Sequence, residues 1–254
     1  MELKDMKKTV AAAALLSAFA LPASADALGI YAGVGQWKND FSGDLLSEQV
    51  QVDDELGLDS ADLTQWYVNF EHPIPLLPNL RLAYSDISES GKGQLNENVE
   101  FDNTTFIAGT EVKSDLQIEM TDVTFYYELW DIGGDLDLGI TARHLDGHVE
   151  LANDLTGSGR ESVDEWVPML YLNGRFDLPL TGLYVGAQGN GVTYSGNRLI
   201  DYSAFVGYDF DIIGPVDVGV QLGYRSMELK LDDIGDFDAD LKLDGVFANL
   251  SLHF

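Results

Sequence analysis

Four histidines are the residues of this chain best suited to catalysis or metal binding. His144 and His148 stand close together in the segment HLDGHVE, whereas His72 and His253 are isolated. In an extended strand, two residues four apart lie about 13 Å from each other, too far for one zinc ion to bind both imidazoles. These two histidines could share a metal ion only if the chain turned at Gly147.

Hydrolysis is the other chemistry that the region around His148 could support. A histidine beside a hydroxyl and a carboxylate can activate a nucleophile, and suitable partners lie nearby: Asp146, Glu150, Ser162, Asp164 and Glu165. The chain contains no nucleophile motif of the G-x-S-x-G or H-x-S kind. We therefore predict that the protein is not an enzyme, and a hydrolytic site remains the alternative.

One acidic segment has part of the spacing of a calcium-binding loop. In DFDAD, Asp236, Asp238 and Asp240 occupy the first, third and fifth ligand positions. Leu241 stands where such a loop needs glycine, and Phe247 stands where it needs a bidentate glutamate. We therefore expect no cofactor, and at most weak calcium binding by these three aspartates.

The chain is strongly acidic, with a net charge of −29. Two predicted loops concentrate this charge: 39–61 holds seven acidic residues and no basic one, and 232–240 holds five. Such a surface repels phosphates, so we expect no nucleic-acid partner. The chain has no cysteine, so disulfide bonds play no part in its fold.

The first 25 residues have the pattern of a secretory signal peptide. Three lysines precede the apolar stretch 9–21, and the tripeptide ASA at 23–25 forms a cleavage site. We expect residues 1–25 to be removed on export and residues 26–254 to form one domain. Beyond the signal, no apolar run reaches the length of about 18 residues that a transmembrane helix needs.

Apolar and polar residues alternate in one segment after another of the remaining chain. In DVTFYYEL, for example, Val123, Phe125 and Tyr127 alternate with more polar neighbours. A period of two is typical of strands with one apolar and one polar face. Ten segments show it: 28–34, 64–71, 80–84, 122–129, 136–143, 166–172, 183–187, 200–209, 216–225 and 246–254.

The connectors between these segments differ in length and composition. Short ones rich in Pro, Gly or Asn follow every second strand: 72–79, 131–134, 177–182 and 211–215. Most of the others are long and acidic: 39–61, 87–115, 152–162 and 232–239. Short periplasmic turns and long extracellular loops are typical of a transmembrane barrel. We predict an all-β, antiparallel, up-and-down β-barrel of about ten strands, with eight or twelve as less favoured counts.

A soluble sandwich or a lipocalin-like barrel would show the same alternation. The membrane is favoured because the apolar face of the ten segments carries no charged residue, and aromatic residues such as Trp66 and Trp166 lie towards its ends, as in interfacial girdles. Pro168 is the exception, since a closed barrel has no free edge for a residue without an N–H. We predict a bulge there.

Several stretches of the chain resemble those of a known family. The turn E-H-P-x-P-L-L-P-N at 71–79 and the terminal Phe254 occur together with LGIYAGVGQWKNDFSGD at 28–44 and LPLTGLYVGAQGN at 178–190. In this combination the chain resembles a family of small outer-membrane β-barrel proteins of Gram-negative bacteria without an established activity. The resemblance implies a barrel in the outer membrane, and it supplies no catalytic residue.

A ten-stranded barrel encloses a narrow lumen, which the polar faces would line. The inward-facing charged candidates are Glu71, Arg81, Asp122, Glu128, Asp137, Arg143, Arg175, Asp201, Asp209, Asp217 and Arg225. Opposite charges in so small a space should pair, and Glu71 and Arg81, which flank one turn, should be neighbours. We expect a structural role or a passive narrow channel for small solutes. The enzymatic alternative is a lipid A or phospholipid hydrolase, or a protease, with its site at the extracellular rim.

The end of the chain, LSLHF, fits the closing strand of such a barrel. Leu250, Leu252 and Phe254 fall on the lipid-facing row, which leaves His253 in the lumen. A terminal aromatic residue on this strand resembles the signal that the outer-membrane assembly machinery recognises. We expect that machinery and periplasmic chaperones as partners during biogenesis, lipid and lipopolysaccharide as partners afterwards, and a monomer.

Overall fold

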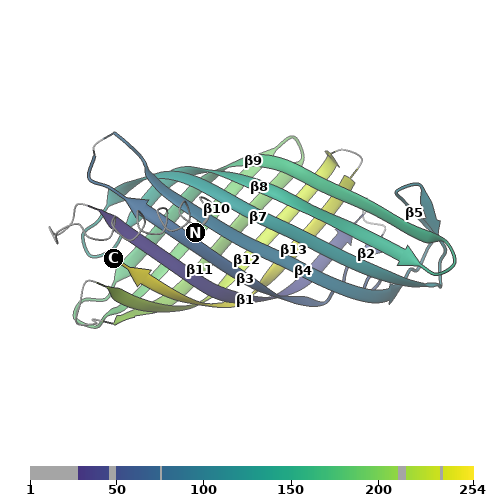
Figure 1. Ribbon diagram of the computed structural model, residues 1–254, viewed down its shortest axis with the longest axis horizontal. Coiled ribbons are helices and arrows are strands. Elements are labelled where there is room, and N and C mark those ends of the chain that lie inside the picture. The colour runs from purple at the N-terminus through teal and green to yellow at the C-terminus, as the bar shows by residue number, and fades with distance from the viewer. Residues whose placement is uncertain (1–27, 46–49, 75, 211–215, 235–236) are drawn as a thin grey trace, which may run out of the picture.

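The chain forms a closed antiparallel β-barrel in a computed structural model that describes residues 28–45, 50–74, 76–210, 216–234 and 237–254. Neighbouring strands of the wall are hydrogen-bonded in chain order, and the last strand pairs with the first to close it (Figure 1). The wall strands are β1 (Gly29–Leu45), β3 (Ser60–Glu71), β4 (Asn79–Gln94), β7 (Glu111–Trp130), β8 (Leu136–Asn153), β9 (Gly157–Asp177), β10 (Leu183–Tyr194), β11 (Asn197–Phe210), β12 (Asp217–Ile234) and β13 (Phe237–His253). The predicted fold class and the count of ten strands are confirmed.

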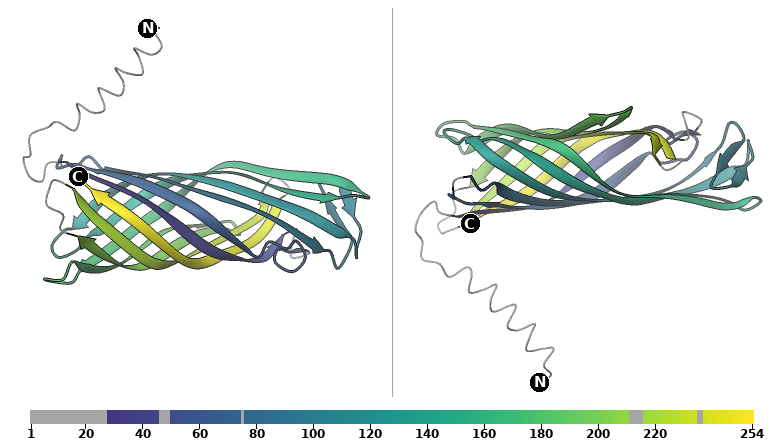
Figure 2. Two further views of the ribbon diagram at one scale, coloured as in Figure 1. Left: turned by 60° about the horizontal axis from the view of Figure 1, so that its bottom comes forward. Right: turned by 90° about the horizontal axis from the view of Figure 1, so that it is seen from above.

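The two ends of the barrel differ. The C-terminus and the β3–β4, β7–β8 and β9–β10 turns lie at one end, the periplasmic end, with β5 at the other (Figures 1 and 2). The predicted turn 211–215 lies outside the described residues, as do the predicted signal peptide and Asp236. No helix in the described part of the chain is long and apolar enough to cross a membrane.

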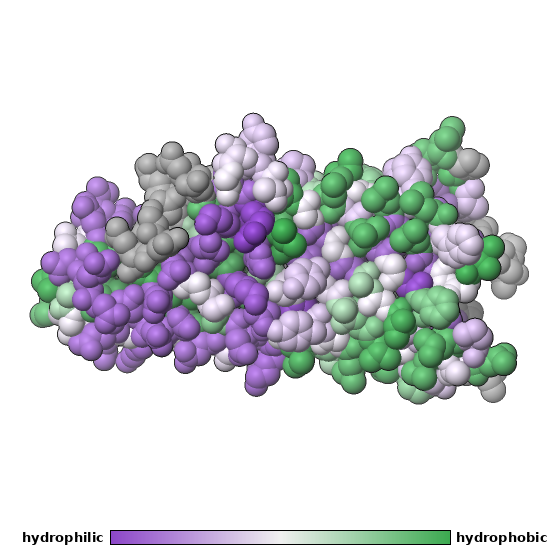
Figure 3. All heavy atoms as spheres, turned by 180° about the vertical axis from the view of Figure 1, so that it is seen from behind, coloured by the Kyte–Doolittle hydropathy of each residue, from purple (hydrophilic) through white to green (hydrophobic). Residues whose placement is uncertain are grey.

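The outer surface near the periplasmic end is apolar. On the face drawn in Figure 3, hydrophobic side chains gather over this half of the barrel and hydrophilic ones over the other half. The lipid-facing band is edged towards the extracellular side by a girdle of aromatic residues: Trp66, Tyr84, Trp166, Tyr202 and Tyr224. A second girdle lies at the periplasmic edge: Phe70, Tyr127, Trp130, Phe176, Tyr208, Phe210 and Phe254. Aromatic rings at both edges match the two lipid–water boundaries of an outer-membrane barrel.

Above the extracellular girdle the apolar residues change to the opposite face of each long strand. In β7 they are odd-numbered from Val123 to Tyr127, facing lipid, and even-numbered from Val112 to Met120, facing inward. The register with β4 and β8 runs unbroken through this change, so no bulge causes it. Below the girdle the outside is lipid, and above it the outside is water. The extracellular half is therefore built like a soluble barrel, with its core inside.

Three short elements close the extracellular end over this core. β2 (Val50–Gln51) pairs with the end of β1, and β5 (Val99–Phe101) pairs with β6 (Thr104–Phe106) in a separate hairpin. The apolar side chains of these elements and of 52–58 are among the most buried in the molecule. None of the following is more than 1% exposed: Val50, Val52, Leu56, Leu58, Phe101 and Phe106. These three elements and 52–58 together form a lid. One bond that holds it runs from the Ser114 side-chain hydroxyl on β7 to the Leu56 backbone carbonyl, 2.6 Å.

Much of what the sequence predicts as long loops is strand. The predicted loop 152–162 is a turn of three residues between β8 and β9. Of 87–115, the two ends, 87–94 and 111–115, extend β4 and β7, and the middle contains β5 and β6. The polarity change explains the difference, because a strand whose apolar face switches sides looks as if it has ended.

The prediction of a bulge at Pro168 is wrong, because β8 and β9 pair without a register shift, with Pro168 opposite Ala142. On its other side, β9 pairs with β10 only as far as Leu170, so Pro168 lies beyond the end of that pairing. The backbone N–H of Arg160 bonds to the Asp102 carboxylate, 3.0 Å, and so points away from β8. Backbone groups alternate sides along a strand, so Pro168 also faces away from β8. The extracellular half of β9 is a free edge, where proline is tolerated.

Candidate functional site in the barrel lumen

Two arginines and two aspartates form an ion cluster across the middle of the lumen. Arg143 binds Asp122 through Nε and Nη2, both at 2.7 Å, and its Nη2 lies 2.9 Å from Asp201. Arg225 binds Asp201 through Nε at 2.8 Å and Nη2 at 2.7 Å. The cluster therefore alternates in charge, Asp122–Arg143–Asp201–Arg225, and its two bidentate contacts have the strong geometry of guanidinium–carboxylate pairs.

The strands position this cluster without any irregular backbone. Asp122 and Arg143 are directly opposite each other on β7 and β8, whereas Asp201 and Arg225 come from β11 and β12 on another part of the wall. The Arg225 guanidinium lies 4.5 Å from the centre of the Trp37 ring, a cation–π distance. Arg143 is 2% exposed. A charge buried this deeply is stable only with full pairing.

The side of the cluster that faces the extracellular end is packed with apolar residues. None of the main ones is more than 6% exposed: Trp37, Phe41, Leu63, Ile87, Leu116, Ile118, Met120, Leu145, Val149, Met169, Met227, Leu241 and Leu243. Met227 reaches the cluster itself, with its sulfur 3.9 Å from Arg143 Nη1. Two layers of described residues therefore fill the lumen: the ion cluster and, on its extracellular side, the apolar core.

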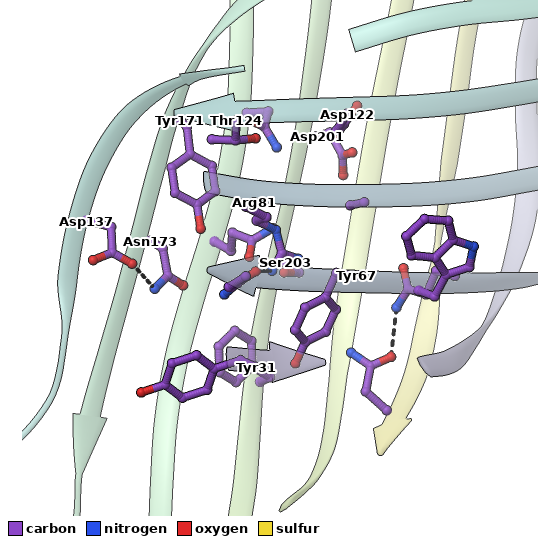
Figure 4. A pocket seen from close by; sticks show the side chains of 18 of the residues that line it. Tyr31, Tyr67, Arg81, Asp122, Thr124, Asp137, Tyr171, Asn173, Asp201 and Ser203 are labelled. Carbon is purple, nitrogen blue, oxygen red and sulfur yellow. Dashed lines mark hydrogen bonds between the residues drawn. The ribbon is translucent and has the colours of Figure 1, made fainter. Parts of the chain in front are cut away.

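The other side of the cluster opens into a polar cavity of about 200 Å³ towards the periplasmic end. Tyrosines, arginines, carboxylates and amides converge on it from most of the wall strands (Figure 4). Tyr31, Tyr67, Arg81, Asp137, Tyr171 and Asn173 are among its labelled lining residues. Arg143, Asp201 and Arg225 of the ion cluster form part of its lining.

Glu71 and Arg81 do not pair with each other, contrary to expectation. Arg81 donates to the side-chain oxygen Oδ1 of Asn69 at 2.7 Å, and its guanidinium lies 4.2 Å from the centre of the Tyr67 ring. Glu71 instead accepts a hydrogen bond from the Tyr126 hydroxyl at 2.7 Å. In the register of β3 and β4, Asn69 stands opposite Arg81. Glu71 lies two residues further along β3, so its carboxylate is not directly opposite the arginine.

The remaining predicted lumen charges lie near the periplasmic mouth. Arg175 bonds Asp177 and Asp209 and stacks on the Tyr184 ring, 3.7 Å from its centre. Asp137 accepts a hydrogen bond from Asn173 at 2.9 Å. Glu128 lines the cavity together with Asp135, a residue of the β7–β8 turn whose pKa is raised by burial.

The four histidines are distributed over both ends and both faces of the barrel. His144 Nε2 lies 2.7 Å from Asp164, and His148 Nε2 lies 3.3 Å from Asp115. Each therefore has its own carboxylate on the outer face of the extracellular half. His72 organises the β3–β4 turn, with Nε2 at 3.2 Å from the Pro78 carbonyl. His253 faces the lumen, where its ring stacks on Tyr31 at 4.0 Å.

No metal site is formed by the described residues, in which no group of three or more His, Cys, Asp or Glu side chains is arranged to hold an ion. Asp240, one of the three candidates in DFDAD, pairs with Lys230 at 2.9 Å. Asp236 and the side chain of Asp238 lie outside the described part of the chain. On the closing strand, Leu250 and Phe254 face outward, 46% and 44% exposed.

The apolar core of the lumen is the part of the site that sequence reasoning missed. The signal is present in β8, where the apolar positions are even-numbered from Leu136 to Ala142 and odd-numbered from Leu145 to Leu151. A single face assigned to the whole strand hides this change. The inward direction of Arg143 and Arg225, by contrast, follows from strand alternation alone.

A closed ten-stranded barrel with a lipid-facing band and a polar lumen belongs to the class of outer-membrane β-barrels. Among solved structures, the chain is similar to the outer membrane protease OmpT from Escherichia coli, with 12% identity, a TM-score of 0.47, and coverage of 91% of this chain and 97% of that chain. It is also similar to Neisserial surface protein A, with 10% identity, a TM-score of 0.29, and coverage of 87% and 95%. No family model and no curated protein matches the chain. These likenesses concern the fold alone.

Proposed function

We propose that this protein is a plugged outer-membrane barrel with a structural role in the envelope, which does not conduct solutes. The observation that supports this proposal is the double filling of the lumen. A passive channel needs a continuous polar path, but Arg143, Asp201 and Arg225 occupy the middle of the lumen and bind one another. Apolar side chains, which offer water no hydrogen bonds, fill the space above them.

Single-channel recording in planar bilayers tests this proposal. The purified protein should give no discrete current steps. A variant with both fillings reduced, Trp37→Ala, Met120→Ala and Leu243→Ala together with Asp201→Ala, should give steps. It removes three apolar residues enclosed in the lumen and the carboxylate that joins the two arginines. The matched control is Leu138→Ala with Ile140→Ala and Leu172→Ala, which removes similar volume from the lipid face. Conductance by the unmodified protein would show that the barrel is a channel.

The hydrolase alternative has one observation in its favour. Asp115 accepts a hydrogen bond from Ser90 at 2.9 Å and contacts His148 at 3.3 Å, and His148 stands directly opposite Ser162 on the next strand. An acid, a base and a hydroxyl are therefore neighbours on three adjacent strands, on the outer face. We nevertheless propose a protein without catalytic activity, because the pocket that His148 and Ser162 line has a volume of only about 30 Å³ and is lined mainly by apolar residues. An esterase or phospholipase activity of the pure protein that Ser162→Ala abolished would establish the alternative.

A further inference from the structure

The periplasmic turns expose large aliphatic side chains. Leu76 in the β3–β4 turn is 92% exposed, Ile132 in the β7–β8 turn is 76% exposed, and Leu180 in the β9–β10 turn is fully exposed at 107%. Leucine and isoleucine are poor choices for the tip of a turn in water, where Gly, Asn and Asp prevail. The same feature therefore occurs in each of the three periplasmic turns that the structure describes.

Two of these turns also place leucine in a backbone conformation that it rarely adopts. Leu76 has a φ of 69° and Leu180 a φ of 67°. Both are the third residue of an X-Pro-Leu-X turn, closed by a bond from Leu77 N to the Ile74 carbonyl at 3.4 Å and from Thr181 N to the Leu178 carbonyl at 3.3 Å. This position favours glycine or asparagine, because a Cβ is strained there.

The third turn shows that the chain uses glycine where a side chain is not required. Gly133, which follows the exposed Ile132, has a φ of 73°, close to the values for the two leucines. In this turn the aliphatic residue precedes the left-handed position, and glycine occupies it. In the other two turns the leucine itself takes the strained position, so its side chain must contribute something that glycine lacks.

Hydrogen bonds from the aromatic girdle place the β3–β4 and β7–β8 turn tips at the edge of the lipid band. The Tyr127 hydroxyl donates to the Leu76 carbonyl at 2.9 Å, and Trp130 Nε1 donates to the Ile132 carbonyl at 2.8 Å. Tyr127 and Trp130 face lipid, 48% and 59% exposed. In Figure 1 the β3–β4 turn leans outward from the barrel wall at this end. The aliphatic tips are therefore continuous with the lipid-facing surface.

We propose that Leu76 and Leu180 are membrane anchors that insert their side chains into the periplasmic, phospholipid leaflet. The girdle holds the β3–β4 and β7–β8 turns at the interface. The β9–β10 turn is bonded to β11 next to the girdle residue Tyr208, through Asp209 N and the Gly182 carbonyl at 2.9 Å. Insertion at the interface buries apolar surface that would otherwise face water. This gain offsets the strain of the left-handed leucines. The barrel would be fixed in depth and tilt by its turns as well as by its strands.

Spin labelling measures the depth of these residues directly, because the chain contains no cysteine to remove. Leu76→Cys and Leu180→Cys would each be labelled and reconstituted in phosphatidylcholine vesicles. The control is Leu155→Cys in the extracellular β8–β9 turn, where the leucine is 80% exposed. At 76 and 180 collisions with oxygen should exceed those with a water-soluble nickel complex, and at 155 the order should be reversed. Labels at 76 and 180 that prefer the nickel complex would overturn the proposal.

A pair of polar substitutions separates anchoring from strain. Asparagine tolerates the left-handed conformation better than leucine, so Leu76→Asn with Leu180→Asn relieves the strain and removes the apolar side chains. If the leucines are anchors, the urea midpoint for unfolding from vesicles should fall, while Leu155→Asn leaves it unchanged. If they are only strained turn residues, the midpoint should rise, and the proposal would be wrong.

Discussion

At the residue scale, Asp201 is the group on which the lumen cluster depends, since it is the one carboxylate bonded to both arginines of the cluster. In Asp201→Ala, Arg143 keeps Asp122, while Arg225 keeps two uncharged partners, the Gln65 oxygen at 2.8 Å and the Trp37 ring. Removal of one partner from a buried ion pair costs about 3–5 kcal/mol. We expect the free energy of unfolding from lipid vesicles, measured by urea titration, to fall by this amount.

The matched control at this scale is Asp164→Ala, which also removes an acid from an ion pair. The Asp164 side chain is 78% exposed beside His144, and such surface pairs contribute about 1 kcal/mol or less. Equal losses in the two variants would mean that burial of the lumen cluster has no energetic consequence. The sequence indicates that Arg143 and Arg225 point inward, but the partners depend on how distant strands meet across the lumen.

At the scale of elements, four acids form one row on the outer face just above the extracellular girdle. Asp86, Glu119, Asp146 and Asp164 stand opposite one another in turn across β4, β7, β8 and β9. Like charges directly opposite destabilise a sheet, by about 0.2–1 kcal/mol for each pair. Glu119→Gln removes two such contacts, so we expect a higher urea midpoint at low ionic strength and a smaller gain at 1 M salt.

The control for the acidic row is Lys113→Gln on the same strand. Lys113 pairs with Asp154 at 2.9 Å, and both side chains are largely exposed, so this change should lower the midpoint slightly if at all. A lower midpoint for Glu119→Gln would show that the row is stabilised by something other than the protein, such as divalent cations. In that case, addition of a chelator should remove the difference.

Because the extracellular half of β9 has a free edge, we expect amide exchange to alternate between fast and slow along it. Ser162, Asp164 and Trp166 share the parity of Arg160 and Pro168, so their N–H groups face the side where the pairing with β10 has ended. Their amides should exchange with solvent faster than those of Val163 and Glu165, which face β8. Uniform protection along this stretch, measured by NMR or by hydrogen-exchange mass spectrometry, would contradict the free edge.

The strands illustrate how far sequence alternation predicts this fold. A period of two identifies all ten wall strands, because each has one face towards lipid and one towards the lumen. It underestimates their length, since the solvent outside the barrel changes from lipid to water at the girdle and the apolar face changes with it. β7 extends from Glu111 to Trp130, whereas the alternation detects only 122–129. The position of this change depends on membrane thickness, which no local pattern encodes.

At the scale of the whole molecule, the protein combines a membrane barrel with a projecting sheet whose apolar core is covered by its own lid. Strands resist proteases because their backbone is paired, whereas turn tips are the preferred sites of cleavage. If this architecture is correct, an external protease should leave the extracellular half largely intact. If 87–115 and 152–162 were flexible loops, digestion would remove them down to the girdle.

Limited proteolysis of the protein in intact outer-membrane vesicles distinguishes these two cases. Leu155, 80% exposed in the three-residue β8–β9 turn, should be an early site for chymotrypsin, which accepts leucine. Cleavage there should yield two fragments that still migrate as one folded species on a gel run without heating, because β8 and β9 stay paired along their whole length. Leu155→Gly should remove this cut and leave the folded species unchanged. Rapid loss of the segment between Leu145 and Trp166 would show instead that the projecting sheet is not stably formed outside the membrane.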